Sequence, residues 1–528
     1  MRVQLVRGLE VSFILVSILS VFMLVGACAS HRTTVSTGNV IVRENAKLGT
    51  QAWQIREEDE ALTQIQAYTS ATSVSPGDKL TFYVSTENEG DPFTIDIYRL
   101  GWYDGDGARS MTSEVESKGQ AQGYYDWHKH TLSNCGSCRV DKSTGLVEAN
   151  WQPSYNLTIP SDWVTGVYLA KFIHTPSGKA RYAPFVVLGN THSTYLAVAS
   201  DNTYQAYNTW GGYSLYDADD VTQSIGQQEG RAVMVSFDRP YVWGRGATDV
   251  LRFEVNAIRW MEMQGYDLSY ISSVDMHRNP GQLLDHRAYI SMGHDEYWSK
   301  EMRDGAENAR DRGVGMIFLG ADASYWQIRY QPDSAGIRDR TIICYKVETD
   351  KADLAHDPFY GQDNSRVTSL WRDPIVGRPE NALIGIMYSD LTHKRWGFPW
   401  QMNPQVSSPL VDGTNLRANQ QYGCNLVGYE WDRVFANGLT PPNLQVLSTS
   451  HTENDAGQAD TSNTSYYIAP SGALVFATGS IYWTLSLDDY RLDPDPACTN
   501  RSEEIPEMHK LMSNVMEAVA VLHPLGRL

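Results

Sequence analysis

The stretch from 287 to 320, RAYISMGHDEYWSKEMRDGAENARDRGVGMIFLG, holds the pattern that decides the fold. Two short apolar runs, AYISM and VGMIFL, flank a segment of helical composition that begins behind Ser299 and stops at Gly313. Serine favours the N-cap of a helix and glycine its end, so the predicted order is strand, loop, helix, strand. Units of this kind form a mostly parallel sheet with helices on both faces.

The same alternation continues on both sides of this stretch. The runs TYLAVAS (194–200) and LSYIS (268–272) are typical of buried strands, and VLRFEVNAIRWMEMQG (250–265) has apolar residues at helical spacing. Three later runs predict further strands, at 444–450, 465–470 and 473–483. A fourth, at 505–522, predicts a closing helix. We therefore expect residues 191–528 to form an α/β domain.

The preceding part of the chain has a different texture. Short segments of alternating polarity, such as LTFYVST (80–86) and GVYLAKFIH (166–174), are separated by Gly, Pro, Asp and Asn. Period-two alternation with this punctuation predicts a β-sandwich over residues 56–190. Since 528 residues exceed what one core usually organises, the sequence predicts a multidomain protein, a sandwich followed by an α/β domain.

The N-terminus has the features of an export signal. Two arginines precede an apolar run from Val11 to Val25, which is short for a membrane span and ends in small residues. Val25-Gly26-Ala27-Cys28 resembles a bacterial lipobox, in which Cys28 would be acylated and anchor the protein to a membrane; ordinary cleavage at a neighbouring alanine is the alternative. We expect residues 1–28 to be removed, residues 29–55 to form a polar tether, and the protein to reach the periplasm or cell surface.

Charge and cysteine content narrow the function. The net charge of −19 would repel a phosphate backbone, which argues against nucleic acid as a partner. Five cysteines follow Cys28, so at least one is not paired within the chain. The group His128, His130, Cys135 and Cys138 is compatible with a zinc site, but an oxidising compartment favours a local Cys135–Cys138 disulfide or an ordinary surface loop.

Polar and aromatic loops follow the predicted strands of the second domain. In open α/β sheets, ligands bind beyond the carboxyl ends of the strands, and the loops 200–212, 293–298 and 320–326 all lie there. A fourth loop, 235–246, also ends a short apolar run. Together they offer the following side chains: Tyr204, Tyr207, Tyr241, His294, Asp295, Glu296 and Asp322. Four such loops at one rim predict a binding or catalytic site.

The chemistry of that site is narrowed by its residue types. The chain has no G-x-S-x-G, G-x-x-x-x-G-K-[ST], G-x-G-x-x-G or H-E-x-x-H motif, so the corresponding hydrolase, phosphate-binding, dinucleotide and zinc-protease classes lose their main support. Tyrosinate and carboxylate oxygens are hard anionic donors that suit a ferric ion. An open coordination position on such an ion would acidify a bound water.

Several motifs together resemble one family, the large (beta) subunit of bacterial N,N-dimethylformamidase. The matching stretches are YQAYNTWGG, SFDRPY, GHDEYWS, FLGADASYWQIRY, NLVGYEWD and TGSIYW, with IYRLGWYDGDGARS before them. The resemblance implies a β-sandwich followed by a class I glutamine-amidotransferase-like, flavodoxin-like α/β domain. It also implies a mononuclear iron held by two tyrosines and a glutamate.

Carried over by motif, the iron ligands would be Tyr207, Tyr241 and Glu296, with Tyr204 as the competing choice for Tyr207. Each has a simpler interpretation as well: Tyr207 could pack against Trp210, and Glu296 could be a carboxylate near the start of a helix.

Three further residues take catalytic roles by the same resemblance. His294 and Glu430 correspond to groups that approach the substrate or the iron-bound water, and Asp322 stands where the resemblance leads us to expect an asparagine. That difference puts the substrate contact in doubt, because a carboxylate cannot donate the hydrogen bond of an amide.

The implied activity is iron-dependent hydrolysis of a small amide, with a small companion subunit or a homo-oligomer as the assembly. The main alternative is a non-catalytic cell-surface protein whose aromatic rim binds a ligand. A glycan hydrolase using Asp295, Glu296 or Asp322 as paired carboxylates is a third possibility.

Overall fold

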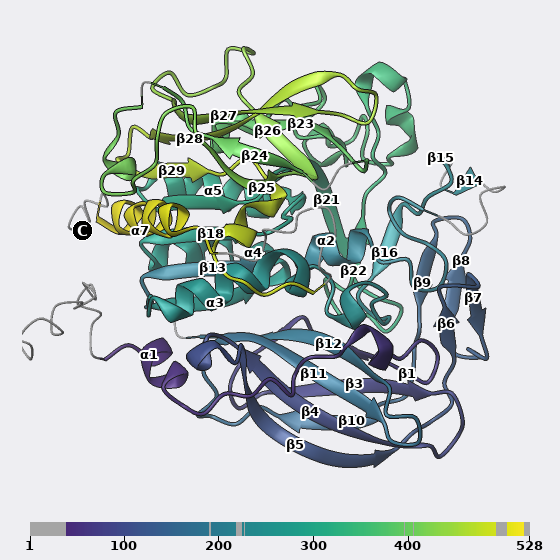
Figure 1. The fold of residues 1–528 in the computed structure, drawn as a ribbon. Helices are drawn as coiled ribbons and strands as arrows, with labels where there is room; N and C mark the ends of the chain where they lie inside the picture. Colours follow the sequence, from purple (N-terminus) through teal and green to yellow (C-terminus); the bar gives the residue numbers. More distant parts are fainter. Residues whose placement is uncertain are drawn as a thin grey trace, which may run out of the picture.

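The computed structural model describes residues 38–189, 192–217, 224–225, 228–394, 397–404, 406–492 and 504–521. Within these ranges the protein is mixed α/β, with antiparallel sheets in its N-terminal part and a mostly parallel sheet later (Figure 1). The export segment 1–28 and the proposed anchor Cys28 lie outside the described residues. Among the helices that are described, none has both the length and the apolar character needed to cross a membrane.

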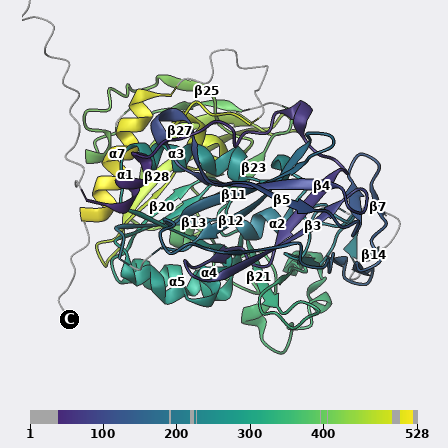
Figure 2. The ribbon, with the colours of Figure 1, turned by 90° about the horizontal axis from the view of Figure 1, so that it is seen from below.

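Two sheets in the N-terminal part enclose a common core. The first contains β1 (Ile65–Thr69), β3 (Lys79–Thr86) and β10 (Tyr155–Thr158). The second has the order β2 (Ser73–Val74), β12 (Ala180–Val187), β11 (Gly166–His174), β4 (Pro92–Leu100) and β5 (Ala108–Lys118), antiparallel except for β2 and β12. Phe82 of the first sheet meets Phe172 and Phe185 of the second edge-to-face. Seen from below, these strands lie in front of the parallel sheet (Figure 2).

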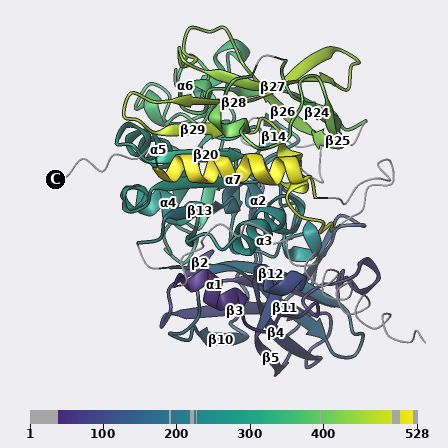
Figure 3. The same cartoon turned by 60° about the vertical axis from the view of Figure 1, so that its left-hand side comes forward.

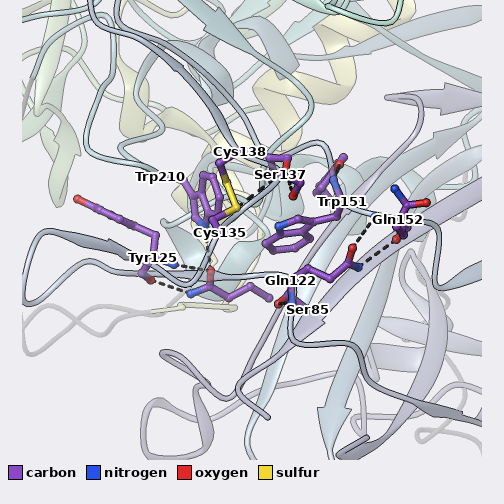
Figure 4. The surroundings of a disulfide bond; sticks show 12 residues. Ser85, Gln122, Tyr125, Cys135, Ser137, Cys138, Trp151, Gln152 and Trp210 are labelled. Carbon is purple, nitrogen blue, oxygen red and sulfur yellow. Dashed lines mark hydrogen bonds between the residues drawn. A yellow bond between two sulfur atoms is a disulfide. The ribbon is translucent and has the colours of Figure 1, made fainter. Parts of the chain in front are cut away.

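Two hairpins extend from these sheets as an arm. They are formed by β6 (Tyr124–Asp126) with β7 (Thr131–Ser133), and β8 (Arg139–Asp141) with β9 (Leu146–Glu148). A Cys135–Cys138 disulfide lies in the loop that connects the two hairpins, beside Trp151 and Trp210 (Figure 4). This confirms the local disulfide and removes the zinc alternative, since zinc binds thiolates. Among the described residues, Cys344 is a free, buried cysteine.

The later sheet has seven strands in the order β17 (Leu268–Ser272), β13 (Tyr195–Ala199), β18 (Ala288–Met292), β20 (Gly315–Leu319), β29 (Leu474–Ala477), β28 (Ala459–Ile468) and β27 (Gln445–Glu453). Neighbouring strands from β17 to β29 are parallel, and the last two pairs are antiparallel. Each of these strands overlaps a run that the sequence predicted. The mixed α/β expectation is therefore confirmed.

Helices cover both faces of this sheet (Figure 3). One face packs on α3 (Val255–Met263) and α7 (Pro506–Val521), and the other on α4 (Ser273–Arg278) and α5 (Lys300–Asp311). Successive strand residues point to opposite faces, so Ile290 joins the core beneath α3 while Tyr289 joins the core beneath α5.

The predicted helix signals act as expected. The Ser299 hydroxyl accepts a hydrogen bond from Met302 N at 3.2 Å and so caps α5. The segment 250–265 begins with a π-helical turn, η4 (Val250–Glu254), continues as α3 and stops before Gly265, whose φ of 73° suits glycine.

The segment expected to be a tether differs from that expectation where it is described. Residues 40–45 form α1 (Val40–Asn45), and Ile41 and Trp53 are fully buried. A polar residue of this segment binds backbone groups of a distant one: the Asn45 Oδ1 atom accepts hydrogen bonds from the backbone amides of Trp102 and Tyr103. The polar composition of this segment therefore did not predict that its described part is helical and packed against the protein.

A buried ion pair joins the N-terminal sheets to the parallel-sheet part. Arg99 on β4 and Glu262 on α3 are both completely buried, and their Nη2 and Oε1 atoms are 2.7 Å apart. The Arg99 guanidinium also donates to the carbonyl oxygen of Thr165 at 2.7 Å. A buried charge pair needs such additional hydrogen bonds, so this junction holds the two parts in one fixed arrangement.

Candidate metal centre

The candidate site lies at the carboxyl ends of three adjacent parallel strands. Helix α2 (Asp201–Ala206) follows β13, the loop containing His294 follows β18, and the loop containing Asp322 follows β20. Backbone contacts join these loops: Glu296 N donates to Thr203 Oγ1 at 3.1 Å, and Ser324 N donates to the Asp295 carbonyl at 2.8 Å. The structure thus brings together the three loops that the sequence placed at one rim.

Four predicted residues form a compact buried cluster there. The His294 Nε2 atom lies 3.2 Å from Glu296 Oε2 and 3.3 Å from Glu430 Oε2. One possible ligand atom each from His294, Glu296 and Asp322 lie within 4.8 Å of one another. Glu430 comes from β26 (Glu430–Arg433), which pairs with β23 (Met387–Leu391). Residues from distant parts of the chain therefore converge on one point.

The cluster leaves several buried polar atoms without a hydrogen bond. In the described part of the chain, these are His294 Nε2, Glu296 Oε2, Asp322 Oδ1 and Glu430 Oε2, which are close together but poorly aligned. Unsatisfied buried groups are rare, and one imidazole cannot neutralise three carboxylates. Ligand atoms on opposite sides of an ion with bonds of ~2.1 Å lie roughly 4 Å apart. The donor types and spacing therefore fit a metal cation.

The pKa shifts within the cluster come from burial and from the charges of neighbouring members of the cluster. Burial raises the pKa of Asp322, and the carboxylates of Glu296 and Glu430 raise it further. Burial also raises the pKa of Glu430, against the opposing effect of His294. For His294, burial by itself would lower the pKa, but the nearby carboxylates of Glu430 and Glu296 outweigh it and raise the pKa. A bound cation would reverse these shifts for the carboxyl groups.

Two tyrosines border this cluster. The Tyr207 ring stacks on the Tyr216 ring at 4.3 Å and lies 5.2 Å from the His294 ring. The Tyr216 hydroxyl donates a hydrogen bond to Glu296 Oε1. The Lys346 ammonium lies 3.3 Å from the centre of the Tyr216 ring. It is also close to the rings of Tyr297 and Trp326.

Tyr216 and Lys346 were not predicted from the sequence. Tyr216 follows Tyr207 by nine residues in the same loop, and that second tyrosine was the available signal. Lys346 could not be assigned from the sequence, because nothing in its local sequence indicates that its side chain lies near the candidate site.

The other two predicted tyrosines lie elsewhere. The Tyr204 hydroxyl donates to Glu254 Oε1, and the Tyr241 ring lies 6.4 Å from the Tyr204 ring. Both line a small cavity together with Asp201 and Arg340. Within the described residues, the contacts of Tyr241 do not include Glu296, so its role as a metal ligand stays a prediction.

The two aspartates of the predicted rim have different environments. The Asp295 carboxylate accepts hydrogen bonds from Ser291 Oγ at 2.7 Å and from the Tyr289 hydroxyl at 3.3 Å, on the sheet side of the loop. Asp322 has a left-handed backbone with φ of 59°, and its backbone amide donates to Asp432 Oδ1 at 2.8 Å. This conformation, which aspartate tolerates better than most residues, directs Asp322 into the cluster.

A cleft of about 430 Å³ opens onto His294. Its lining combines aromatic, basic and acidic side chains: Tyr207, Asp217, Trp243, Asp249, Arg252, His294, Thr392, His393, Lys394, Tyr429 and Tyr482. The candidate metal-binding cluster therefore reaches, through His294, a space that a ligand can enter.

Residues 94–500, which include every member of the cluster, match the family described as N,N-dimethylformamidase beta subunit-like, C-terminal. The chain belongs to this family. The shared region covers most of the N-terminal sheets and nearly all of the parallel-sheet part. The resemblance seen in the sequence motifs is thereby confirmed.

Two curated relatives of this family member are N,N-dimethylformamidase beta subunits. The protein of Alcaligenes sp. is 20% identical over 458 residues, which are 73% of this chain and 58% of the relative. The protein of Paracoccus aminophilus is 21% identical over 453 residues, 72% of this chain and 58% of the relative. The chain thus spans a little over half of the length of the relatives it matches.

A solved structure of a Paenibacillus sp. cycloisomaltooligosaccharide glucanotransferase in complex with cycloisomaltoheptaose gives a TM-score of only 0.17. It is 8% identical and covers 51% of this chain and 56% of that chain. An overlap of this size carries no information about the fold or the function of the family member.

Proposed function

We propose that the protein is a metal-dependent amidohydrolase that cleaves the C–N bond of an amide in the cleft beside His294. The observation that supports this most is the buried group of His294, Glu296 and Asp322, with Glu430 beside it, whose facing atoms have no hydrogen-bond partner among the described residues. His294 is the member of this group that lines the cleft. Relatives named N,N-dimethylformamidase beta subunit make an amide the first substrate class to test.

Iron is the metal that these donors suit best. Glu296 and Asp322 supply carboxylate oxygens, His294 supplies a nitrogen, and the phenols of Tyr207 and Tyr216 border the same space. Hard, anionic oxygen donors match a ferric ion. When bound, such an ion polarises an amide carbonyl and lowers the pKa of a water molecule.

The chain's own groups would position the reactants and move the proton. Tyr216 holds Glu296 through its hydroxyl hydrogen bond and so fixes that carboxylate. Glu430 lies beside the candidate ligands, with its Oε2 atom 3.3 Å from His294 Nε2. Amide cleavage requires a proton on the departing amine, and the Glu430 carboxyl group can deliver it. The Phe253, Tyr429 and Tyr482 rings exclude water from one side.

Iron content measured in purified variants tests the metal assignment. We expect Glu296→Gln to lose bound iron and Tyr207→Phe to lose the tyrosinate-to-iron charge-transfer absorption, because the Tyr207 ring lies 5.2 Å from that of His294. Tyr241→Phe is the matched comparison and should retain both, because Tyr241 lines the separate cavity. Iron that persists in Glu296→Gln would refute the proposal. Loss of colour in Tyr241→Phe alone would instead support the ligand set implied by the family resemblance.

Glu430→Gln tests the proton-transfer role separately. The neutral amide keeps the shape of the side chain but cannot hold and release the proton. We therefore expect amine release to fall by about 10²–10⁴-fold while iron content stays unchanged. Full activity in this variant would exclude Glu430 from the reaction.

Three further features remain proposals. Export and a lipid anchor at Cys28 rest on the N-terminal sequence alone, and a small companion subunit rests on the relatives' description as beta subunits. The β-sandwich assignment of the N-terminal sheets and the glutamine-amidotransferase-like assignment of the parallel sheet agree in strand direction with the observed order.

A further inference from the structure

The π-helical turn η4 sends three consecutive side chains to three different places. Arg252 lines the cleft, Phe253 forms part of the aromatic cluster, and Glu254 accepts a hydrogen bond from Ser200 N at 3.1 Å. Turns of this kind occur frequently at functional sites, because the extra residue redirects neighbouring side chains. The turn thus places a guanidinium directly beside an apolar wall.

That wall consists of aromatic rings next to the metal-binding cluster. The Phe253 ring centre lies 6.4 Å from that of His294, 6.3 Å from Tyr429 and 6.1 Å from Tyr482. Tyr429 and Tyr482 line the cleft themselves. An apolar group placed against these rings would therefore lie close to the imidazole of His294.

The guanidinium of Arg252 has N–H donors that are available to a ligand. Its side chain is 43% exposed, and its guanidinium carbon lies 5.0 Å from the centre of the Phe253 ring. In the ranges that the structure describes, its one ion-pair partner is Asp249, at the long distance of 3.8 Å. A guanidinium has five N–H donors in a planar fork that matches a carboxylate, so most of its binding capacity is free.

Two further basic side chains lie in the same cleft as Arg252. His393 and Lys394 also line the cleft, in a chain whose net charge is −19. His393 Nδ1 lies 3.0 Å from Asp455 Oδ2, so the Asp455 carboxylate partly offsets the charge of these two basic residues. Of the two acidic lining residues, Asp249 is buried and Asp217 is exposed at the edge.

We propose that the substrate is an amide that carries a carboxylate and an apolar body, as an N-acyl aromatic amino acid does. The carboxylate binds Arg252, the apolar body packs on Tyr429 and Tyr482, which Phe253 supports from behind, and the amide reaches His294. This inference rests on the proposed amidohydrolase function. A cleft of about 430 Å³ also falls within the ~300–1,000 Å³ of pockets that hold drug-sized ligands, which is more space than a simple formamide requires.

Binding to the iron-loaded protein tests the charge requirement directly. The probes are N-acetyl-L-phenylalanine and its methyl ester, which differ in the negative charge, measured by isothermal titration calorimetry. We expect the acid to bind at least about 10-fold more tightly than the ester, because hydrogen bonds to charged groups contribute ~1.5–3 kcal/mol. N-acetylglycine, which keeps the charge but lacks the ring, should bind more weakly than the acid.

Variants assign that preference to a residue. Arg252→Gln should weaken binding of the acid by about 10- to 100-fold and leave the ester unchanged. Arg56→Gln, a substitution of a 70% exposed arginine outside the cleft, should change neither. Equal affinity for the acid and the ester, or an Arg252→Gln variant that binds both as the wild type does, would overturn the proposal.

Hydrolysis measured in parallel separates this proposal from the function on which it rests. Amine release from neutral amides with no preference for the carboxylate would refute the substrate class and support the amidohydrolase. Charge-selective binding without hydrolysis of any probe would support the Arg252 site and count against the amidohydrolase.

Discussion

Single residues of the candidate site differ in how far the sequence revealed them. His294, Glu296, Asp322 and Glu430 lie in short motifs, and the structure places all four in one cluster. Tyr216 could not be assigned in the same way, because its contact with Glu296 depends on how the loop after α2 folds back. Motifs report which residue types are present, whereas a ligand set depends on side-chain directions that only the folded loops define.

Glu254 gives a residue-scale prediction about pH. Burial raises the pKa of this carboxyl group to about 8, from an ordinary value of 4.5. The folded protein therefore keeps a proton on Glu254 that the unfolded chain releases near pH 4.5, so this group's contribution to stability is lost as the pH rises from about 5 to 8. Glu254→Gln cannot ionise and should not show that loss.

Urea unfolding across this range measures the effect. We expect the free energy of unfolding of Glu254→Gln to gain on that of the wild type by roughly 3 kcal/mol between pH 5 and pH 8. A constant difference between the two proteins over the whole range would show that Glu254 does not hold its proton in the folded state.

At the scale of elements, the sequence was most informative where strands and helices have strong local signals. Helix α5 begins behind Ser299 and α3 ends before Gly265, as the cap residues predicted. The segment 38–55 contains a helix that the sequence did not predict, and its Asn45 side chain binds the backbone of residues 102 and 103, which are distant in sequence. Local composition cannot report a partner of that kind.

The ends of β18 and β20 approach each other so closely that Gly320 admits no side chain. A Cβ atom there would lie 1.9 Å from the Gly293 carbonyl oxygen. Gly320→Ala must therefore push apart the two loops that carry His294 and Asp322. We expect a loss of about 1–3 kcal/mol in the free energy of unfolding, together with reduced iron content.

Gly136→Ala is the control for this substitution, because no heavy atom lies within 4 Å of the added Cβ. Urea unfolding and metal analysis of both variants provide the comparison. A Gly320→Ala protein as stable as Gly136→Ala, with its iron retained, would mean that the two loops can separate without cost.

For the whole molecule, the junction between the N-terminal sheets and α3 controls how the parts unfold. Removing one partner of the buried Arg99–Glu262 pair leaves the other charge without compensation, at a cost of about 3–5 kcal/mol. We expect Arg99→Met and Glu262→Met each to show that loss in urea unfolding. The double variant should recover much of it, because two apolar side chains need no counter-charge.

The order of antiparallel sheets followed by a mostly parallel sheet was predictable from periodicity, but this junction was not. Arg99 and Glu262 are 163 residues apart, and each looks like an ordinary surface charge in its own segment. If the double variant proves less stable than both single variants, each side chain makes a contribution to stability that is separate from the charge pair.

The helical segment from η4 through α3 also defines a direction in the molecule. It begins at Arg252 in the cleft and ends near Gly265, whose carbonyl oxygen accepts a hydrogen bond from Asn39 Nδ2 at 2.7 Å. Fourteen helical residues span roughly 20 Å, so the chain enters the folded body at the far end of this segment from the cleft. In a protein attached through its N-terminus, as we propose, the length of this segment would therefore separate the first described residues from the opening of the cleft.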